Sequence, residues 1–153
     1  MDAVERCFHF DVSEYFFRLT TESIRLHSNR VFNHSTFQTV VDDRANSAND
    51  LCERYDADDM SEHLRIIPSN GCVGLSFCIL ESSASRIEEA LPELEQAIGT
   101  SLQFQDALSL ILYDMVVEAN ATEVLTKLGM TSEEAAEYRV VLKRTKTNVV
   151  PFK

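Results

Sequence analysis

Residues 72–80 read CVGLSFCIL, and this stretch decides the class of fold. Apolar side chains alternate there with small ones: Val73, Leu75, Phe77 and Ile79 against Gly74, Ser76 and Cys78. A period of two predicts a β-strand with one apolar face, which we expect to be buried or to form an interface. The preceding Pro68-Ser69-Asn70-Gly71 predicts a tight turn, so residues 63–67 are expected to supply the partner strand of a hairpin.

Two helices are predicted after this strand. Glu81 opens the first, whose apolar residues recur at helical spacing: Ala84, Ile87, Leu91, Leu94 and Ile98. Gly99 ends this helix, and Pro92 within it predicts a kink or a restart. The second helix is capped by Ser101, and its wide apolar face between Phe104 and Val116 predicts a central position.

Further helices are predicted on both sides of this region. Residues 7–12 alternate as a short strand or as the lead into a helix, and Ser13 caps a helix to about residue 28. Ser35 caps a helix with one apolar stripe, which consists of Phe37, Val41, Ala45, Ala48, Cys52 and Tyr55. Residues 124–128 and 131–144 also have helical patterns, and the chain has no recognisable internal repeat. The predicted fold class is α+β, predominantly helical, with four or five helices and a small antiparallel β-hairpin.

The order of strand 73–80, helix 83–98, turn 99–101 and helix 101–117 resembles the ribbon-helix-helix family of DNA-binding proteins. The resemblance implies that the strand pairs with a two-fold mate and presents its outward side chains to the major groove. Those positions would be Gly74, Ser76 and Cys78, which offer almost no groups that read bases. A dimeric DNA-binding transcriptional regulator is therefore the second function that we consider.

Charge divides the chain into two regions. The 153 residues are enough for one domain with its own core, and 14 Lys and Arg against 25 Asp and Glu give a net charge of −11. Removing the five cations of residues 139–153, which include no acid, leaves −16 on residues 1–138. We expect an acidic helix-rich globular domain over 1–138 and a basic C-terminal helix end and arm over 139–153. Such acidity argues against a surface that binds DNA, RNA or anionic lipid.

Two charged sets are the candidate binding residues. The first lies on the expected outer face of the helix after Ser35 and comprises Asp42, Asp43, Asp50, Glu53, Asp56, Asp58 and Asp59. It is either a binding surface for a basic partner or a solvated face. The second is the basic arm, Arg139, Lys143, Arg144, Lys146 and Lys153, which we expect to dock on an acidic protein surface rather than on DNA. The leading function is a non-enzymatic acidic protein-interaction module: a regulator, adaptor or inhibitor.

Neither a catalytic residue nor a cofactor or metal site is predicted. The glycine loops that bind phosphates and the spacings that bind zinc or calcium do not occur in the sequence, so we expect no enzyme. A small enzyme with an unrecognised site remains the third alternative. The N-terminal residues do not resemble a signal peptide, and no apolar run is long enough to cross a membrane. A cytoplasmic location is expected, with all four cysteines as free thiols.

A homodimer is also expected. Residues 37–55 and 84–98 form two apolar seams, and the strand is apolar on one face and small on the other. Together these surfaces exceed what one helical domain with a hairpin needs for its own core.

Overall fold

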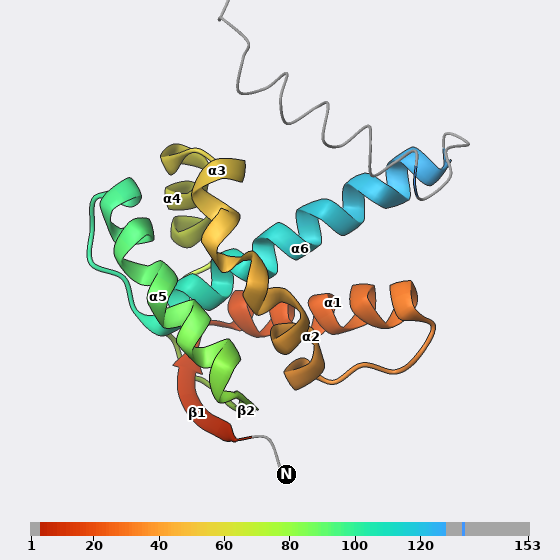
Figure 1. Cartoon of the computed structure of the whole chain (residues 1–153), viewed down its shortest axis with the longest axis horizontal. Helices are drawn as coiled ribbons and strands as arrows, with labels where there is room; N and C mark the ends of the chain where they lie inside the picture. The colour runs from red at the N-terminus through yellow and green to blue at the C-terminus, as the bar shows by residue number, and fades with distance from the viewer. Residues whose placement is uncertain (1–3, 128–132, 134–153) are drawn as a thin grey trace, which may run out of the picture. The chain divides into compact units, whose positions relative to one another are not determined.

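A computed structural model describes residues 4–127 and residue 133 (Figure 1). Met1–Val116 forms one compact unit and Val117–Lys153 a second. Within the second unit, the described residues are the last part of one long helix and Glu133. The basic arm and the helix expected over 131–144 lie outside the described residues, apart from Glu133.

The described chain is predominantly helical with one two-stranded antiparallel sheet, which confirms the predicted fold class. The elements in order are β1 (Glu5–Val12), α1 (Glu14–Val31), α2 (Phe37–Arg44), the 3₁₀-helix η1 (Ala45–Asp50), α3 (Leu51–Arg54), α4 (Ala57–Ile66), β2 (Val73–Leu80), α5 (Glu81–Ile98) and α6 (Phe104–Lys127). The predicted cap Ser13 accepts a hydrogen bond from the Phe16 N–H, and Gly99 ends α5. Pro92 lies inside α5 without dividing it. Residues 124–127 continue α6 rather than forming a separate helix.

The predicted hairpin partner is wrong. Strand β2 pairs with β1, and residues 63–66 belong to α4 instead. Asp56 caps α4 by accepting a hydrogen bond from the Asp59 N–H, and Met60 and His63 are buried one turn apart. This cap and this helical spacing stabilise a helix where the neighbouring turn residues suggested a strand.

The helix expected after Ser35 is divided into three pieces, although its stripe faces the core. Val41, Ala45, Ala48 and Tyr55 of that stripe are buried. The interruption is η1, whose sequence ANSAND is rich in Asn, Ser and Asp. Such side chains form hydrogen bonds to nearby backbone groups and therefore compete with regular α-helix.

A structural repeat relates the two halves of the first unit through a shift of 67 residues, which is the separation of His9 and Ser76. The shift takes the whole of α1 onto α5 and the first residue of α2, Phe37, onto the first residue of α6, Phe104. It also takes Phe32 onto Gly99, the C-caps of α1 and α5, and both have left-handed backbone. The first half is therefore built as strand, helix, loop and helix, like the second.

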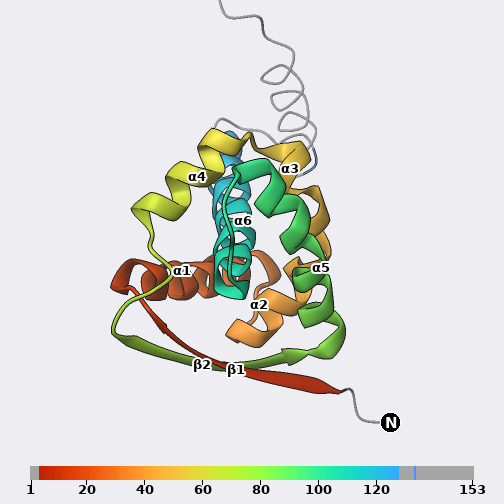
Figure 2. The same cartoon turned by 90° about the vertical axis from the view of Figure 1, so that its left-hand side faces the viewer.

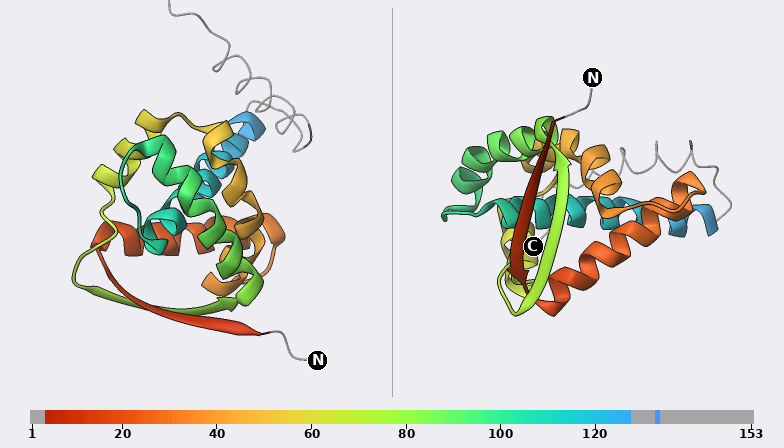
Figure 3. Two further views of the ribbon diagram at one scale, coloured as in Figure 1. Left: turned by 60° about the vertical axis from the view of Figure 1, so that its left-hand side comes forward. Right: turned by 90° about the horizontal axis from the view of Figure 1, so that it is seen from below.

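The ribbon formed by β1 and β2 lies on the two-fold axis of this repeat. His9 pairs with its own equivalent, Ser76, at the centre of the ladder. In Figure 3 (right), α1 and α5 leave opposite ends of the ribbon toward opposite sides. The aromatic contacts obey the same symmetry, because the Phe37–Phe77 ring contact corresponds to that of Phe104 with Phe10. The resemblance implied that strand 73–80 pairs with a two-fold mate. That mate is β1 of the same chain.

The repeat is not recognisable in the sequence, because what repeats is burial rather than residue identity. Phe16, Thr20, Ser23 and His27 in α1 are buried, and so are their equivalents Ser83, Ile87, Ala90 and Leu94 in α5. Each pair differs in side chain, so the same helix face is used twice with different residues. The two halves therefore share almost no recognisable residue identity along these helices.

The core surrounds the first part of α6, as its wide apolar face predicts. Leu108, Leu110, Ile111 and Leu112 are fully buried. Figure 2 shows the ribbon below the helices, with α6 in the middle. The inner face of the ribbon contributes an aromatic cluster, in which the Phe8 and Phe104 ring centroids are 4.4 Å apart.

Candidate functional site on the outer face of the ribbon

The ribbon has one covered face and one open face. Because side chains alternate along a strand, the aromatic inner residues leave the other set pointing away from the helices. This outer ribbon face consists of Glu5, Cys7, His9 and Asp11 of β1 and Gly74, Ser76, Cys78 and Leu80 of β2. Most of these residues are exposed, and Figure 2 shows helices on the other side of the ribbon only.

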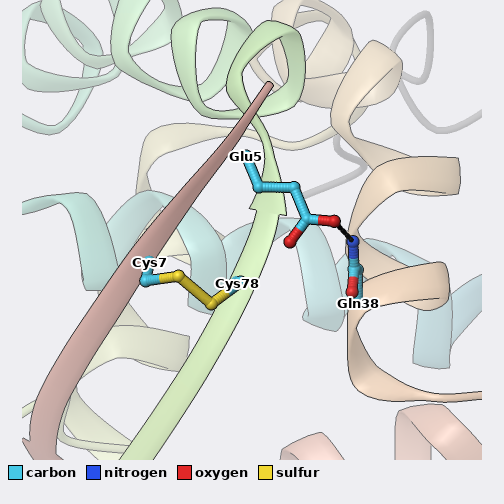
Figure 4. The surroundings of a disulfide bond; sticks show 4 residues. All are labelled: Glu5, Cys7, Gln38 and Cys78. Carbon is cyan, nitrogen blue, oxygen red and sulfur yellow. Dashed lines mark hydrogen bonds between the residues drawn. A yellow bond between two sulfur atoms is a disulfide. The ribbon is translucent and has the colours of Figure 1, made fainter. Parts of the chain in front are cut away.

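A disulfide bond between Cys7 and Cys78 crosses the outer ribbon face (Figure 4). The two residues lie directly opposite each other in the β1–β2 register, where side chains are close enough to bond. The prediction of four free thiols is therefore wrong for this pair, whereas Cys52 and Cys72 are free. The sequence carries no signal for the bond, because 71 residues separate its cysteines and only the strand register brings them together.

His9 occupies the centre of the outer ribbon face. A hydrogen bond of 2.7 Å joins its Nδ1 to Oγ of Ser76, and its Nε2 lies 3.5 Å from a carboxylate oxygen of Asp11. The other acid of the face, Glu5, accepts a hydrogen bond of 3.3 Å from the Gln38 side chain (Figure 4). The acidic side chains of the face are therefore Glu5 and Asp11, and neither strand places a Lys or Arg there.

Arg6 fastens one end of the ribbon to α5. Its guanidinium donates hydrogen bonds to the carboxylates of Glu81 and Glu88, and these bonds raise the pKa of Arg6. The Glu81 N–H also donates to the backbone oxygen of Val4, at 2.8 Å. Arg6, the one Lys or Arg within β1 and β2, is thus already engaged within the chain.

The acids predicted as a binding face do not share one helix. They are spread over α2, η1, α3 and α4 together with the cap of α4: Asp42 and Asp43, Asp50, Glu53, and Asp56, Asp58 and Asp59. Several of them have partners in the chain. Asp42 accepts a hydrogen bond from the Leu80 N–H at 3.0 Å, and Asp43 accepts one from His27 at 2.7 Å.

The remaining acids of that set divide into engaged and exposed residues. Asp50 forms an ion pair with Arg54, and Asp56 caps α4. Glu53 and Asp58 are exposed on the surface. The set therefore offers a looser surface than a single helix face, and its exposed acids include Glu53 and Asp58.

A buried cluster around Asp114 was not predicted. This carboxylate is fully buried and accepts hydrogen bonds from Arg44 at 3.0 Å, Arg54 at 2.7 Å and Tyr55 at 2.7 Å. Burial and the bond to Asp114 raise the pKa of the Tyr55 hydroxyl. The one available signal is an acid inside the apolar run of α6. Because its partners come from the chain itself, we assign the cluster to holding α2, α3 and α6 together.

His63 is a second buried polar residue. Its Nε2 forms a 2.8 Å hydrogen bond with Oγ of Ser109, and its ring lies 4.5 Å from that of Tyr113. Burial lowers the pKa of His63 to about 4, so the imidazole is neutral at pH 7. Among residues 4–127 and 133, no group of three or more His, Cys, Asp or Glu is arranged to bind a metal ion.

No family model, no curated protein and no solved structure matches the chain. In the part of the chain that the structure describes, no helix is both long enough and apolar enough to span a membrane.

Proposed function

We propose that this chain is a non-enzymatic protein-interaction module, a regulator, adaptor or inhibitor, that binds its partner through the outer ribbon face. One observation carries the proposal: this face is open, and Glu5 and Asp11 give it acidic charge. Carboxylates accept hydrogen bonds from Lys and Arg, so the expected partner is a protein surface with basic side chains.

The same charge argues for a protein rather than for DNA. Proteins that bind duplex DNA neutralise phosphates with Lys and Arg, and they read bases with groups such as Arg and Asn. The outer ribbon face offers acids, a disulfide and small side chains, while Arg6 is engaged with Glu81 and Glu88. Approach of a duplex to this face would bring negative charge against negative charge.

The partner can be tested with matched charge reversals. The double variant Glu5→Lys and Asp11→Lys should lose the partner in a pull-down from source lysate treated with nuclease. The control variant Glu53→Lys and Asp58→Lys, with the same change in net charge, should retain it. Loss with the control alone would instead assign binding to the acids predicted from the sequence.

A DNA-binding regulator is the second candidate, and the two-fold ribbon favours it. The paired strands with two helices from each half are similar to the arrangement of the ribbon-helix-helix family, here within one chain. Fluorescence anisotropy with a mixed duplex pool, on the intact chain and on a version that ends at Tyr138, separates the candidates. If the intact chain binds the duplex saturably and the version that ends at Tyr138 does not, the DNA-binding regulator becomes the first candidate.

A cytoplasmic location also belongs to the proposal. In that compartment a disulfide is usually transient or redox-sensing, so Cys7–Cys78 would be found partly reduced in cells. Alkylation of free thiols during lysis, followed by mass spectrometry, measures that fraction.

A further inference from the structure

We propose that Cys7–Cys78 is a thiol–disulfide exchange site that takes a low-molecular-weight thiol, with Cys7 as the attacked residue. The inference concerns the chemistry of the disulfide and holds whichever macromolecule binds the ribbon. It rests on the position of the bond in the fold, on its exposure, and on the repeat that relates the two ends of the ribbon.

The two cysteines of the bond differ in exposure. Both lie on the outer ribbon face, but Cys7 is exposed whereas Cys78 is half-buried. Exchange requires a thiolate to reach one sulfur of the bond, and access decides which one. An incoming thiolate therefore attacks Cys7, and Cys78 is the leaving group.

The ribbon does not depend on the bond for its pairing. Under the two-fold repeat, the position equivalent to Cys7 is Gly74 and the position equivalent to Cys78 is Asp11. Asp11 and Gly74 also pair with each other, so the opposite end of the ribbon has the same pairing without a covalent bond. At the disulfide end, the Arg6 ion pairs and the Val4–Glu81 backbone bond hold β1 to the start of α5.

Reduction therefore leaves two thiols facing each other in a ribbon that remains folded. A thiolate RS⁻ attacks the Cys7 sulfur, a bond forms between them, and the Cys7–Cys78 bond breaks with its electron pair on the Cys78 sulfur. Cys78 takes a proton from water, and Cys7 carries the mixed disulfide. A second RS⁻ attacks the R-bearing sulfur of the adduct, RSSR forms, and the Cys7 sulfur leaves as a thiolate that takes a proton from water. Two electrons thus pass to the protein and two thiols are oxidised. The reverse steps restore the bond.

The test uses the full chain with Cys52→Ser and Cys72→Ser, which removes the free thiols from the measurement. The folded protein is incubated with reduced and oxidised glutathione as the probe, quenched with acid and analysed by peptide mass spectrometry. We expect the mixed disulfide on Cys7 to exceed that on Cys78 by about tenfold, because access selects the attacked sulfur. Circular dichroism should show the same helix content before and after reduction.

Two further variants separate exchange from unfolding. Cys78→Ser should fold and keep a stable glutathione adduct on Cys7, whereas Cys7→Ser should fold and take up the adduct several times more slowly at Cys78. Reduction that occurs only in denaturant would overturn the proposal. So would an adduct mainly on Cys78, or loss of helix content in either variant.

Discussion

His9 lies opposite Ser76 at the centre of the ribbon, and a 2.7 Å hydrogen bond joins their side chains. The two residues are also equivalents under the internal repeat, so this pair marks the two-fold axis. A two-stranded sheet alone is marginal in water and needs helices on one face. Here α1 and α5, one from each half, leave the two ends of the ribbon, so one chain supplies both halves of the arrangement.

Replacing Phe32 by Gly should stabilise the protein. Phe32 has a φ of 56° and is 94% exposed, so it bears the cost of left-handed backbone with little burial in return. That cost is about 1–2 kcal/mol, and the greater freedom of Gly in the unfolded chain offsets part of it. We expect a gain of about 0.5–1 kcal/mol in urea denaturation.

Gly99→Ala is the matched control, at the equivalent cap of α5. Its φ is 86° and a Cβ there would meet open space, so only the backbone conformation opposes the substitution. The variant should lose about 1 kcal/mol. The two substitutions should therefore change stability in opposite directions. A change in the same direction for both would contradict the equivalence of the two caps.

Replacing Asp114 by Asn should destabilise the fold severely. The substitution leaves Arg44 and Arg54 facing a neutral group at a buried site, and removing one member of a buried ion pair costs about 3–5 kcal/mol. Asp50→Asn breaks a partly exposed ion pair of Arg54 and should cost less than about 1 kcal/mol. Urea denaturation of the two variants measures both values; a small loss for Asp114→Asn would contradict the assigned role of the cluster.

His63 should make the protein less stable as the pH falls from 7 to 5. Burial lowers its pKa in the folded state to about 4 from an ordinary value of 6.5, so the unfolded chain binds more protons in this window. Stability from this residue is complete above pH 6.5, and about 2 kcal/mol of it is lost by pH 5. This loss of stability levels off below about pH 4, the pKa of His63 in the folded state.

His63→Gln isolates this contribution. The variant should be less stable at pH 7, yet its stability should change little between pH 7 and pH 5. Arg partners lower the pKa of carboxylates such as Glu22 and Glu62. These groups therefore lose their contribution to folding stability mainly below pH 5. An unchanged slope in the variant would assign the pH dependence to other groups.

Sedimentation at micromolar concentration should give a monomer. The homodimer expected from the sequence rests on two apolar seams, and residues of both are buried inside one chain, such as Ala45 and Ala48 of the first and Ile87 and Leu94 of the second. Strand β2, which was expected to pair with a second copy, pairs with β1 of the same chain. A concentration-dependent dimer would show that association uses another surface.

Local signals were sufficient for several elements. The cap Ser13, the stop at Gly99 and the spacing from Ala84 to Ile98 predict α1 and α5, because caps and side-chain periodicity act within one or two turns. The wide apolar face of α6 likewise predicts its central position. The failures concern pairing. Residues 63–66 were expected in the sheet because a turn sequence follows them, but β1 forms the ladder with β2 instead.

The sequence by itself determined the helices with clear caps and stripes, the strand at 73–80, the helical fold class and the acidic surface. The tertiary structure alone decided the partner of that strand, the Cys7–Cys78 bond, the cluster around Asp114 and the two-fold repeat. Each of these depends on residues that are far apart in the chain, and on a strand register in which a shift of one residue would turn every side chain to the other face. Short-range periodicity contains no information about that register, whereas packing of the aromatic inner face against Phe37 and Phe104 selects it.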